Sequence, residues 1–205
     1  MRFLLIDTTT SNIIVSIIDN YKVLYEYKDK ILSDMSSIIL PIIKEGLDSL
    51  KWQLDDIDKI FIVNGPGSFT GIRVGVTVAK TIAWALKKDI IPLSSLELMA
   101  TTYYNKKYLV PMIDARRGNV FAGIYDKDLN CIRADQLVCL QDFINDLNDD
   151  YELISYDNIN DSIRPNINVL KIINKHINTK SINPHNLNPN YLKLTEAEEN
   201  KLKND

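Results

Sequence analysis

Two aspartates in the chain follow the same local pattern and could take part in the same chemistry. Asp7 and Asp114 each end a short apolar run and are followed by a polar turn and a second apolar run. In a phosphotransferase of this design, the two carboxylates would hold a metal ion and the two turns would bind phosphate. The same acids could instead only accept hydrogen bonds within their own turns, so a catalytic use and a structural use both stay open.

The two turns differ in how well they suit an anion. The first turn, residues 8–11, is Thr-Thr-Thr-Ser and lacks a glycine, although its hydroxyl groups can donate hydrogen bonds. The second turn contains Arg116, Arg117 and Gly118, and arginine binds phosphates and carboxylates through paired N–H groups. The second turn therefore predicts contact with an anion or an acidic partner, unless its arginines form only surface salt bridges.

A cluster of glycines is the third feature that could serve chemistry. Four of the seven glycines lie within residues 65–75, after the apolar run 59–63 and at the start of a proline-free segment that reaches residue 86. This order predicts a strand, a glycine turn and a helix N-terminus, an arrangement that often binds phosphate through free backbone N–H groups. The spacing matches neither the Walker pattern nor the dinucleotide pattern GxGxxG. A tight turn with close helix packing and no ligand therefore stays an equal alternative.

These features define a set of candidate residues for binding a nucleotide or another anion. The set joins the two acid-tipped turns, the glycine turn and the start of the helix that follows it. Its members are Asp7, Thr8, Gly65, Gly67, Ser68, Thr70, Arg73, Asp114, Arg116 and Arg117. No metal site is predicted, because the chain has only two histidines and two cysteines and they show no metal-ligand spacing.

The predicted helix after the glycine turn carries small residues at every fourth position. Gly71, Gly75, Ala79 and Ala83 would form one stripe on a single face. Two glycines inside a helix cost about 2 kcal/mol relative to alanine, and another helix packed closely along the stripe would offset that cost. The pattern predicts that Gly75→Leu abolishes association with a partner helix while the protein stays folded.

The composition describes a globular protein without the charge of a nucleic-acid-binding domain. Hydrophobic residues make up 45% of the 205 residues, enough for a sizeable core. The net charge of −3 and the pI near 5.5 argue against RNA binding by the chain's own electrostatics, so any RNA contact should be shared with a partner. No apolar run is long enough to span a membrane, and an acid at position 7 interrupts the apolar start too early for a signal peptide. The expected location is the cytoplasm.

Two segments repeat one another at a constant offset of 107 residues. Residues 3–19 and 110–126 align without a gap and are identical at five of seventeen positions, including both aspartates. Each copy reads as a strand, an acid, a short turn and a second strand, which predicts a β-hairpin with a carboxylate at its tip. Duplication predicts two α/β lobes across a cleft, an N-terminal lobe of residues 1–105 and a smaller C-terminal lobe of residues 106–205.

The apolar spacing elsewhere predicts the elements that would position these residues. Pro41 should kink or restart the first helix. The remaining predicted elements of the first lobe are a strand at 22–28, a helix at about 33–50, a strand at 59–63 and a helix at 70–86, and an apolar segment at 90–93 with a helix at 96–104 leads to the second copy. In the second lobe, helices are predicted at 140–147 and 168–178 and a strand at 151–156.

These segments resemble the TsaB (YeaZ) family, accessory proteins in the synthesis of threonylcarbamoyladenosine in tRNA. The resemblance is carried by IDTTTSN from residue 6, GPGSFTGIRVGVTVAKTIAWAL from residue 65, IPLSSLELMA from residue 91 and DARRGNVF from residue 114. A Pro-Asn-Tyr-Leu-Lys segment at 189–193 is similar to an ending common in the family. The resemblance implies a duplicated actin-like (ASKHA) fold, and the second lobe is reduced in this chain.

The resemblance also implies a function and a set of partners. The chain would be a non-catalytic, activating subunit that dimerises with a catalytic TsaD-like paralogue, which transfers threonylcarbamoyl to the adenosine next to the anticodon of tRNA. A TsaE-like ATPase would join the pair, tRNA would be reached only through the complex, and the chain alone could form a homodimer. The implied partner-binding residues lie on two helices and are Met35, Ile38, Ile39, Ile42, Gly71, Val74, Gly75, Val78, Ala79 and Ile82.

The resemblance implies no catalytic residue and no cofactor of the chain's own, with ATP or ADP possible at the interface of the complex. The catalytic paralogue binds its metal with a pair of histidines on a helix, and this chain has no histidine before His176. The alternative is an independent ASKHA-type small-molecule kinase or ATPase, for which Asp7, Asp114 and the glycine turn are the motivation. A protease is not supported, because no Ser/His/Asp set is evident.

Overall fold

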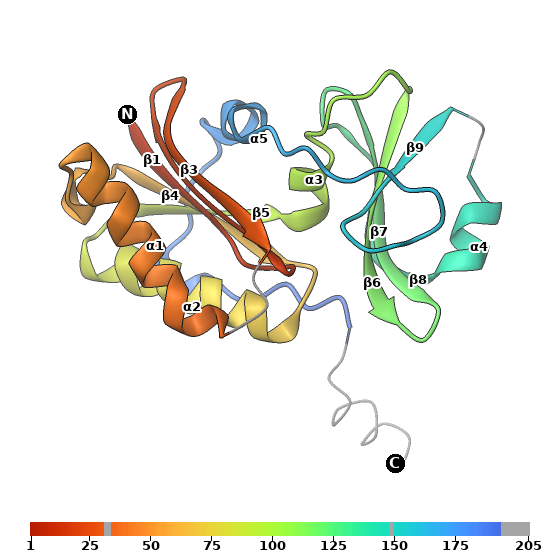
Figure 1. The fold of residues 1–205 in the computed structure, drawn as a ribbon, viewed down its shortest axis with the longest axis horizontal. Coiled ribbons are helices and arrows are strands. Elements are labelled where there is room, and N and C mark those ends of the chain that lie inside the picture. The colour runs from red at the N-terminus through yellow and green to blue at the C-terminus, as the bar shows by residue number, and fades with distance from the viewer. Residues whose placement is uncertain (31–33, 148–149, 194–205) are drawn as a thin grey trace, which may run out of the picture.

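The computed structural model describes residues 1–30, 34–147 and 150–193 and shows two lobes, each built on one β-sheet (Figure 1). The N-terminal sheet has five strands in the order β3-β2-β1-β4-β5, and the C-terminal sheet has four in the order β8-β7-β6-β9. In each sheet, three antiparallel strands are followed by a strand that pairs in parallel with the first of them. The shared strand order confirms a duplicated α/β fold with a reduced second lobe.

Most of the predicted elements are present, but the strand Cys131–Cys139 was not predicted, and the predicted helix 96–104 is the shorter helix Ser95–Met99. The first helix continues through Pro41 without a restart, and its predicted beginning at residue 33 lies outside the described residues. The N-terminal lobe contains β1 (Arg2–Asp7), β2 (Asn12–Asp19), β3 (Lys22–Lys30), α1 (Met35–Leu50), η1 (Leu54–Asp56), β4 (Lys59–Gly65), α2 (Phe69–Ala85), β5 (Asp89–Ser94) and α3 (Ser95–Met99). The rest of the chain contains β6 (Tyr108–Arg116), β7 (Asn119–Asp126), β8 (Cys131–Cys139), α4 (Leu140–Asn145), β9 (Tyr151–Ile154), α5 (Val169–His176) and η2 (Pro184–Asn186).

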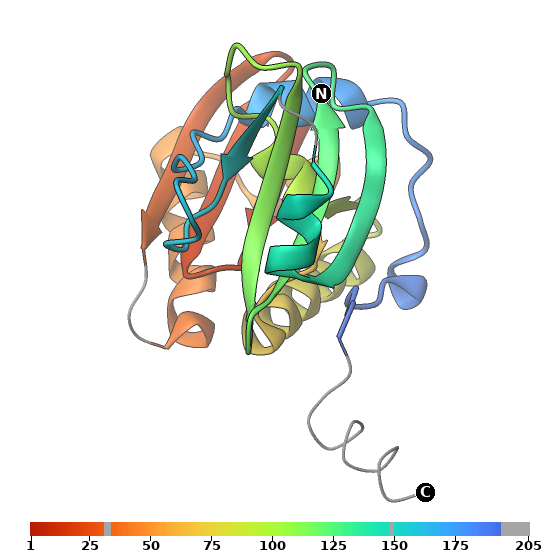
Figure 2. The ribbon, with the colours of Figure 1, turned by 90° about the vertical axis from the view of Figure 1, so that its right-hand side faces the viewer.

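Strand β1 is buried on both faces because other elements cover each of them. Phe3 and Leu5 face the core between the two lobes, whereas Leu4 and Ile6 face the core beneath α1 and α2. In Figure 1, α1 and α2 cover one face of the N-terminal sheet, and α3 and α5 lie on its other side. Helix α4 covers the outer face of the C-terminal sheet (Figure 2). The molecule is therefore layered, with an apolar core between its two sheets.

The chain after α5 returns to the N-terminal lobe. Ile182 pairs with Ile90 of β5, and Leu187 is buried in the core beneath α2. Farther on, the backbone N–H of Asn190 donates to the carbonyl oxygen of Asn64 at 2.8 Å. The predicted C-terminal lobe of residues 106–205 therefore includes a segment that packs on the other lobe.

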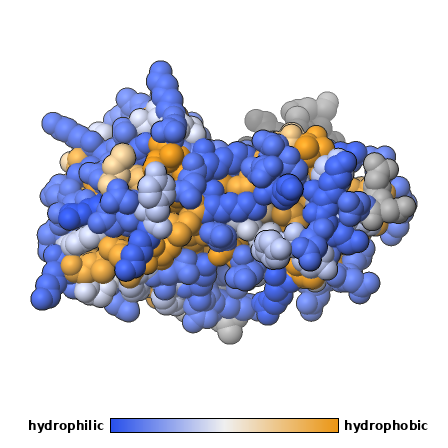
Figure 3. All heavy atoms as spheres, turned by 90° about the horizontal axis from the view of Figure 1, so that it is seen from above, coloured by the Kyte–Doolittle hydropathy of each residue, from blue (hydrophilic) through white to orange (hydrophobic). Residues whose placement is uncertain are grey.

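The surface carries scattered apolar side chains. Seen from above, the molecule is mainly hydrophilic, and hydrophobic residues show through on both lobes (Figure 3). Within the described ranges, no helix has both the length and the apolar character needed to cross a membrane.

Candidate functional site

Asp7 is buried at the tip of the first hairpin, only 4% exposed. Its Oδ1 accepts hydrogen bonds from the Thr9 backbone N–H at 2.8 Å and from the Thr9 hydroxyl at 2.7 Å. Burial raises the pKa of the Asp7 carboxyl to about 6, although the two bonds from Thr9 oppose the rise. In this structure Asp7 accepts bonds within its own turn, which is the structural use of this acid.

The buried carboxyl of Asp7 should make stability depend on pH. Its folded-state pKa, about 6, lies above the unfolded value of 3.8, so the folded protein binds this proton more tightly. The contribution of Asp7 to stability therefore falls as the pH rises from about 4 to about 6. Asp7→Asn keeps the oxygen that Thr9 needs and removes the charge. Between about pH 4 and pH 7, we expect the free energy of unfolding of the wild type to fall by about 3 kcal/mol relative to that of Asp7→Asn, measured by chemical denaturation. Parallel pH profiles of unfolding free energy for the two proteins would contradict this.

The glycine turn is closed by the first hairpin. The backbone N–H of Ser68 donates to the carbonyl of Thr9 at 2.7 Å, and the hydroxyl of Thr8 donates to the carbonyl of Gly71 at 2.7 Å. A Cβ atom on Gly67 would collide with the Thr9 carbonyl, and one on Gly71 would collide with the Thr8 carbonyl. Glycine is therefore needed where the two backbone turns meet. This geometry favours the tight-turn interpretation of the cluster over the phosphate-binding one.

The C-terminal strap, which we define as residues 186–193, covers another side of the glycine turn. Gly65 has a φ of +127°, and a Cβ atom there would lie 2.5 Å from the carbonyl oxygen of Asn190. The hydroxyl of Ser95 donates to the carbonyl of Pro66 at 2.5 Å. The glycine turn is thus held by the first hairpin, by the strap and by the start of α3.

The strap also ties α2 to the second lobe. The ring of Tyr191 packs against Phe69 with 4.7 Å between centroids, and its hydroxyl accepts a hydrogen bond from Arg73 Nε at 2.8 Å. Two residues farther on, Lys193 donates to the carbonyl of Ala115 in β6 at 2.9 Å. Arg73, which the sequence suggested for an anion, therefore binds a tyrosine of its own chain.

Asp114 makes the equivalent contact in the second hairpin. Its Oδ1 accepts a hydrogen bond from the backbone N–H of Arg116 at 2.8 Å, as Asp7 accepts one from Thr9. The turn residues 116–118 have left-handed backbones, with φ of 65°, 54° and 74°, and are exposed. The two acids share their turn geometry, but Asp114 is exposed where Asp7 is buried.

The predicted anion-binding residues fall into two groups in space. Asp114, Arg116 and Arg117 lie on the second hairpin. The other predicted residues gather around the glycine turn and are Asp7, Thr8, Gly65, Gly67, Ser68, Thr70 and Arg73. Thr70 is exposed, whereas most of the other polar groups in this set form hydrogen bonds within the two turns or with the strap. Among the residues that the structure describes, no group of three or more His, Cys, Asp or Glu side chains is placed to hold a metal.

The small-residue stripe of α2 faces the chain's own lobe, which corrects one prediction. Gly71, Gly75, Ala79 and Ala83 are buried, and a Cβ atom on Gly75 would collide with the hydroxyl of Thr8. The stripe lets α2 approach the first hairpin and β4, and this packing offsets the cost of two helical glycines. The prediction that a partner helix packs on the stripe is therefore wrong, and Gly75→Leu would clash inside the lobe.

The surface that α1 and α2 offer to solvent consists of other residues. Six of the predicted partner-binding residues are buried: Ile39, Ile42, Gly71, Gly75, Ala79 and Ile82. We define the outer helix surface as five apolar residues of α1 and α2 that are exposed or half-buried: Met35, Ile38, Leu40, Val74 and Val78. Leu40 was not predicted and is 53% exposed.

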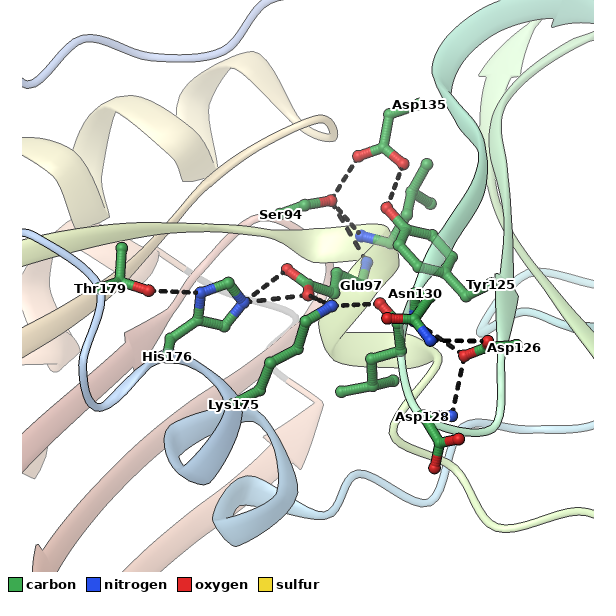
Figure 4. A network of polar contacts seen from close by, with 12 residues as sticks. Ser94, Glu97, Tyr125, Asp126, Asp128, Asn130, Asp135, Lys175, His176 and Thr179 are labelled. Carbon is green, nitrogen blue, oxygen red and sulfur yellow. Dashed lines mark hydrogen bonds and ion pairs between the residues drawn. The ribbon is translucent and has the colours of Figure 1, made fainter.

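A polar network joins the two lobes and was not foreseen from the sequence (Figure 4). Glu97 of α3 forms ion pairs with Lys175 Nζ at 2.7 Å and with His176 Nε2 at 2.9 Å, both from α5. Lys175 also donates to the carbonyl of Leu129 in the second lobe. Burial raises the pKa of the Glu97 carboxyl, but the bonds from His176 and Lys175 outweigh it, so the pKa lies below its usual value.

A second part of the network links the two sheets directly. Asp135 of β8 accepts hydrogen bonds from the hydroxyls of Ser94 in β5 and Tyr125 in β7, each at 2.5 Å. Burial raises the pKa of Asp135 and also that of Tyr125. The contact between Ser94 and Asp135 joins segments 41 residues apart, so no local motif marks it.

The two sheets of like topology and their acid-tipped hairpins define a two-lobed α/β protein built from a duplicated unit. A family model described as "TsaD: tRNA N6-adenosine threonylcarbamoyltransferase" matches residues 30–149. The chain belongs to this family, and curated relatives that match it over most of its length are named TsaB.

The curated relatives match only part of their own length. "tRNA threonylcarbamoyladenosine biosynthesis protein TsaB" of Bacillus subtilis is 35% identical over 148 residues, covering 70% of this chain and 65% of the relative. The Escherichia coli protein of the same name is 32% identical over 135 residues, covering 64% of this chain and 58% of the relative. The matched part of the chain therefore spans less than two thirds of these relatives.

A solved structure shares the fold over nearly the whole chain. It is an uncharacterized protein with similarity to peptidase YeaZ from Pseudomonas aeruginosa, with a TM-score of 0.81 and 20% identity. The superposition covers 94% of this chain and 99% of that one. At this identity the similarity establishes the common fold.

Proposed function

We propose that the chain is a non-catalytic, activating subunit of the complex that attaches threonylcarbamoyl to the adenosine next to the anticodon of tRNA. The TsaB names of its relatives and the TsaD family model support its place in this pathway. The chain acts in the cytoplasm by dimerising with a catalytic TsaD-like paralogue. A TsaE-like ATPase joins the pair, tRNA is reached through the complex, and ATP or ADP binds at the interface of the complex.

The observation that carries the non-catalytic role is the filled space between the lobes. One apolar core extends from Phe3 and Phe61 in the N-terminal sheet to Phe121 and Ile154 in the C-terminal sheet. Enzymes that close two lobes around a substrate need a cleft that can open, whereas a shared core resists such opening. The ion pairs of Glu97 across the same junction add to this resistance.

The outer helix surface is the proposed contact with the catalytic paralogue. Helices α1 and α2 contact each other on one face of the N-terminal sheet (Figure 1). Leu40 is exposed, and Val74 and Val78 are half-buried one turn apart on α2. Apolar side chains left on a helix layer suit packing against further helices. A homodimer of the isolated chain would use the same surface.

The alternative of an independent kinase or ATPase receives less support from the geometry. Such an enzyme would need Asp7 and the glycine turn available to its substrates. Instead, Asp7 binds Thr9, and the N–H of Ser68 binds the hairpin backbone. ATP turnover by the isolated chain that is lost on Asp7→Asn would restore this alternative.

Association with the catalytic paralogue tests the proposed function. When the two proteins are mixed, we expect a one-to-one heterodimer in size-exclusion chromatography with light scattering. If the isolated chain is a homodimer, adding the paralogue should convert it into the heterodimer, because both assemblies use one surface. Two separate peaks for the mixture would contradict the proposal.

A further inference from the structure

A groove of about 790 Å³ lies at the C-terminal end of α2. One side is formed by the last residues of α2 and the start of β5, and the other by residues 181–185 of the segment that returns from α5. The groove lies at the opposite end of α2 from the glycine turn and includes none of the predicted anion-binding residues.

Trp84 gives this groove an exposed aromatic face. The side chain is 60% exposed, and its ring lies 6.2 Å from that of His185 between centroids, at an interplanar angle of 71°. The other tryptophan of the chain, Trp52, is instead covered by the guanidinium of Arg2, whose Cζ lies 4.1 Å from the ring centroid. Exposed aromatic side chains stack readily on nucleic-acid bases, since every base has a π-face.

The groove also carries more positive than negative charge, in a chain whose net charge is −3. Lys87 and Lys88 line it together with one acid, Asp89, whose Oδ1 accepts a hydrogen bond from Ser181 at 2.9 Å. The two lysines follow the C-terminus of α2, where positive charge stabilises a helix. The ammonium group of Lys88 donates to the carbonyl of Asp55 at 2.7 Å, so Lys87, which is exposed, is the lysine left for an anion in the groove.

We propose that this groove binds an unpaired nucleotide, with the base stacked on Trp84 and the phosphate held by Lys87. The nucleotide is either free or part of an RNA strand, because both present the same base and phosphate. The binding belongs to the isolated chain and does not rest on the proposed function.

Tryptophan fluorescence tests the stacking. Trp52→Phe leaves Trp84 as the single tryptophan of the chain, so its emission can be followed during titration with AMP, with a short oligoadenylate and with inorganic triphosphate. We expect AMP or the oligoadenylate to quench the emission and triphosphate to leave it unchanged. Quenching by AMP would identify a site for free nucleotides, and quenching by the oligoadenylate alone would identify an RNA contact. Absence of quenching by both would overturn the proposal.

Two variants test the residues separately by calorimetry. Trp84→Leu and Lys87→Asn should each weaken binding of the quenching ligand at least about tenfold. Asparagine suits position 87 because Lys87 has a left-handed φ of 52°. Lys51→Asn is the matched control, since Lys51 is an exposed lysine with φ of 57° at the end of α1. Unchanged affinity in Trp84→Leu, or equal losses in Lys87→Asn and Lys51→Asn, would overturn the proposal.

Discussion

Replacing Gly71 by alanine should destabilise the protein by about 3 kcal/mol or more, although alanine is the better helix former. The added Cβ atom would collide with the carbonyl oxygen of Thr8. Thr8 is fully buried and donates its hydroxyl hydrogen bond back to Gly71, so neither backbone can move aside without breaking this contact. Chemical denaturation measures the loss, and thermal unfolding should show a midpoint lower by about 6–12 °C.

Gly118→Ala is the control for this prediction. Gly118 has a φ of +74°, and a Cβ atom there would meet nothing within 4 Å. The substitution should therefore cost only the strain of a left-handed alanine, about 1 kcal/mol. If Gly71→Ala is no more destabilising than Gly118→Ala, the close approach of α2 to the first hairpin is contradicted.

Leu40→Glu should weaken the heterodimer with the catalytic paralogue about 100-fold or more, because it would bury a charge in an apolar helix contact. Leu40 is 53% exposed in this chain, so the fold itself should tolerate the change. The dissociation constant can be measured by calorimetry or by surface binding.

Ile132→Glu is the matched control for the interface. Ile132 is also 53% exposed, but it lies on β8 in the second lobe. It should leave the dissociation constant unchanged. Equal effects of the two substitutions, or none from Leu40→Glu, would show that the outer helix surface is not the contact.

The duplicated fold could be predicted from the sequence because its signals are local. Asp7 and Asp114 sit in segments that align without a gap, and both accept a hydrogen bond from the backbone N–H two positions later. Their different exposure could not be predicted, since equal local patterns say nothing about what covers each turn. The N-terminal turn is packed between α2, the glycine turn and the core, whereas the second turn projects into solvent.

The direction in which α2 faces could not be predicted either. Small residues at every fourth position show that something approaches the helix closely, but they do not show what. In the structure the groups that approach Gly71 and Gly75 are the carbonyl and the hydroxyl of Thr8, not a helix of another protein. The contacts of Glu97 with Lys175 and His176, and of Tyr191 with Arg73, join distant parts of the chain and leave no periodic signal.

Reconstituted tRNA modification tests the central claim most directly. The catalytic paralogue and the ATPase are assayed without this chain, with the wild type and with Asp7→Asn. We predict that threonylcarbamoyladenosine forms only when the chain is present, and that Asp7→Asn supports the reaction as well as the wild type does. Equal modification without the chain, or loss of modification with an Asp7→Asn protein that still forms the heterodimer, would contradict a non-catalytic, activating subunit.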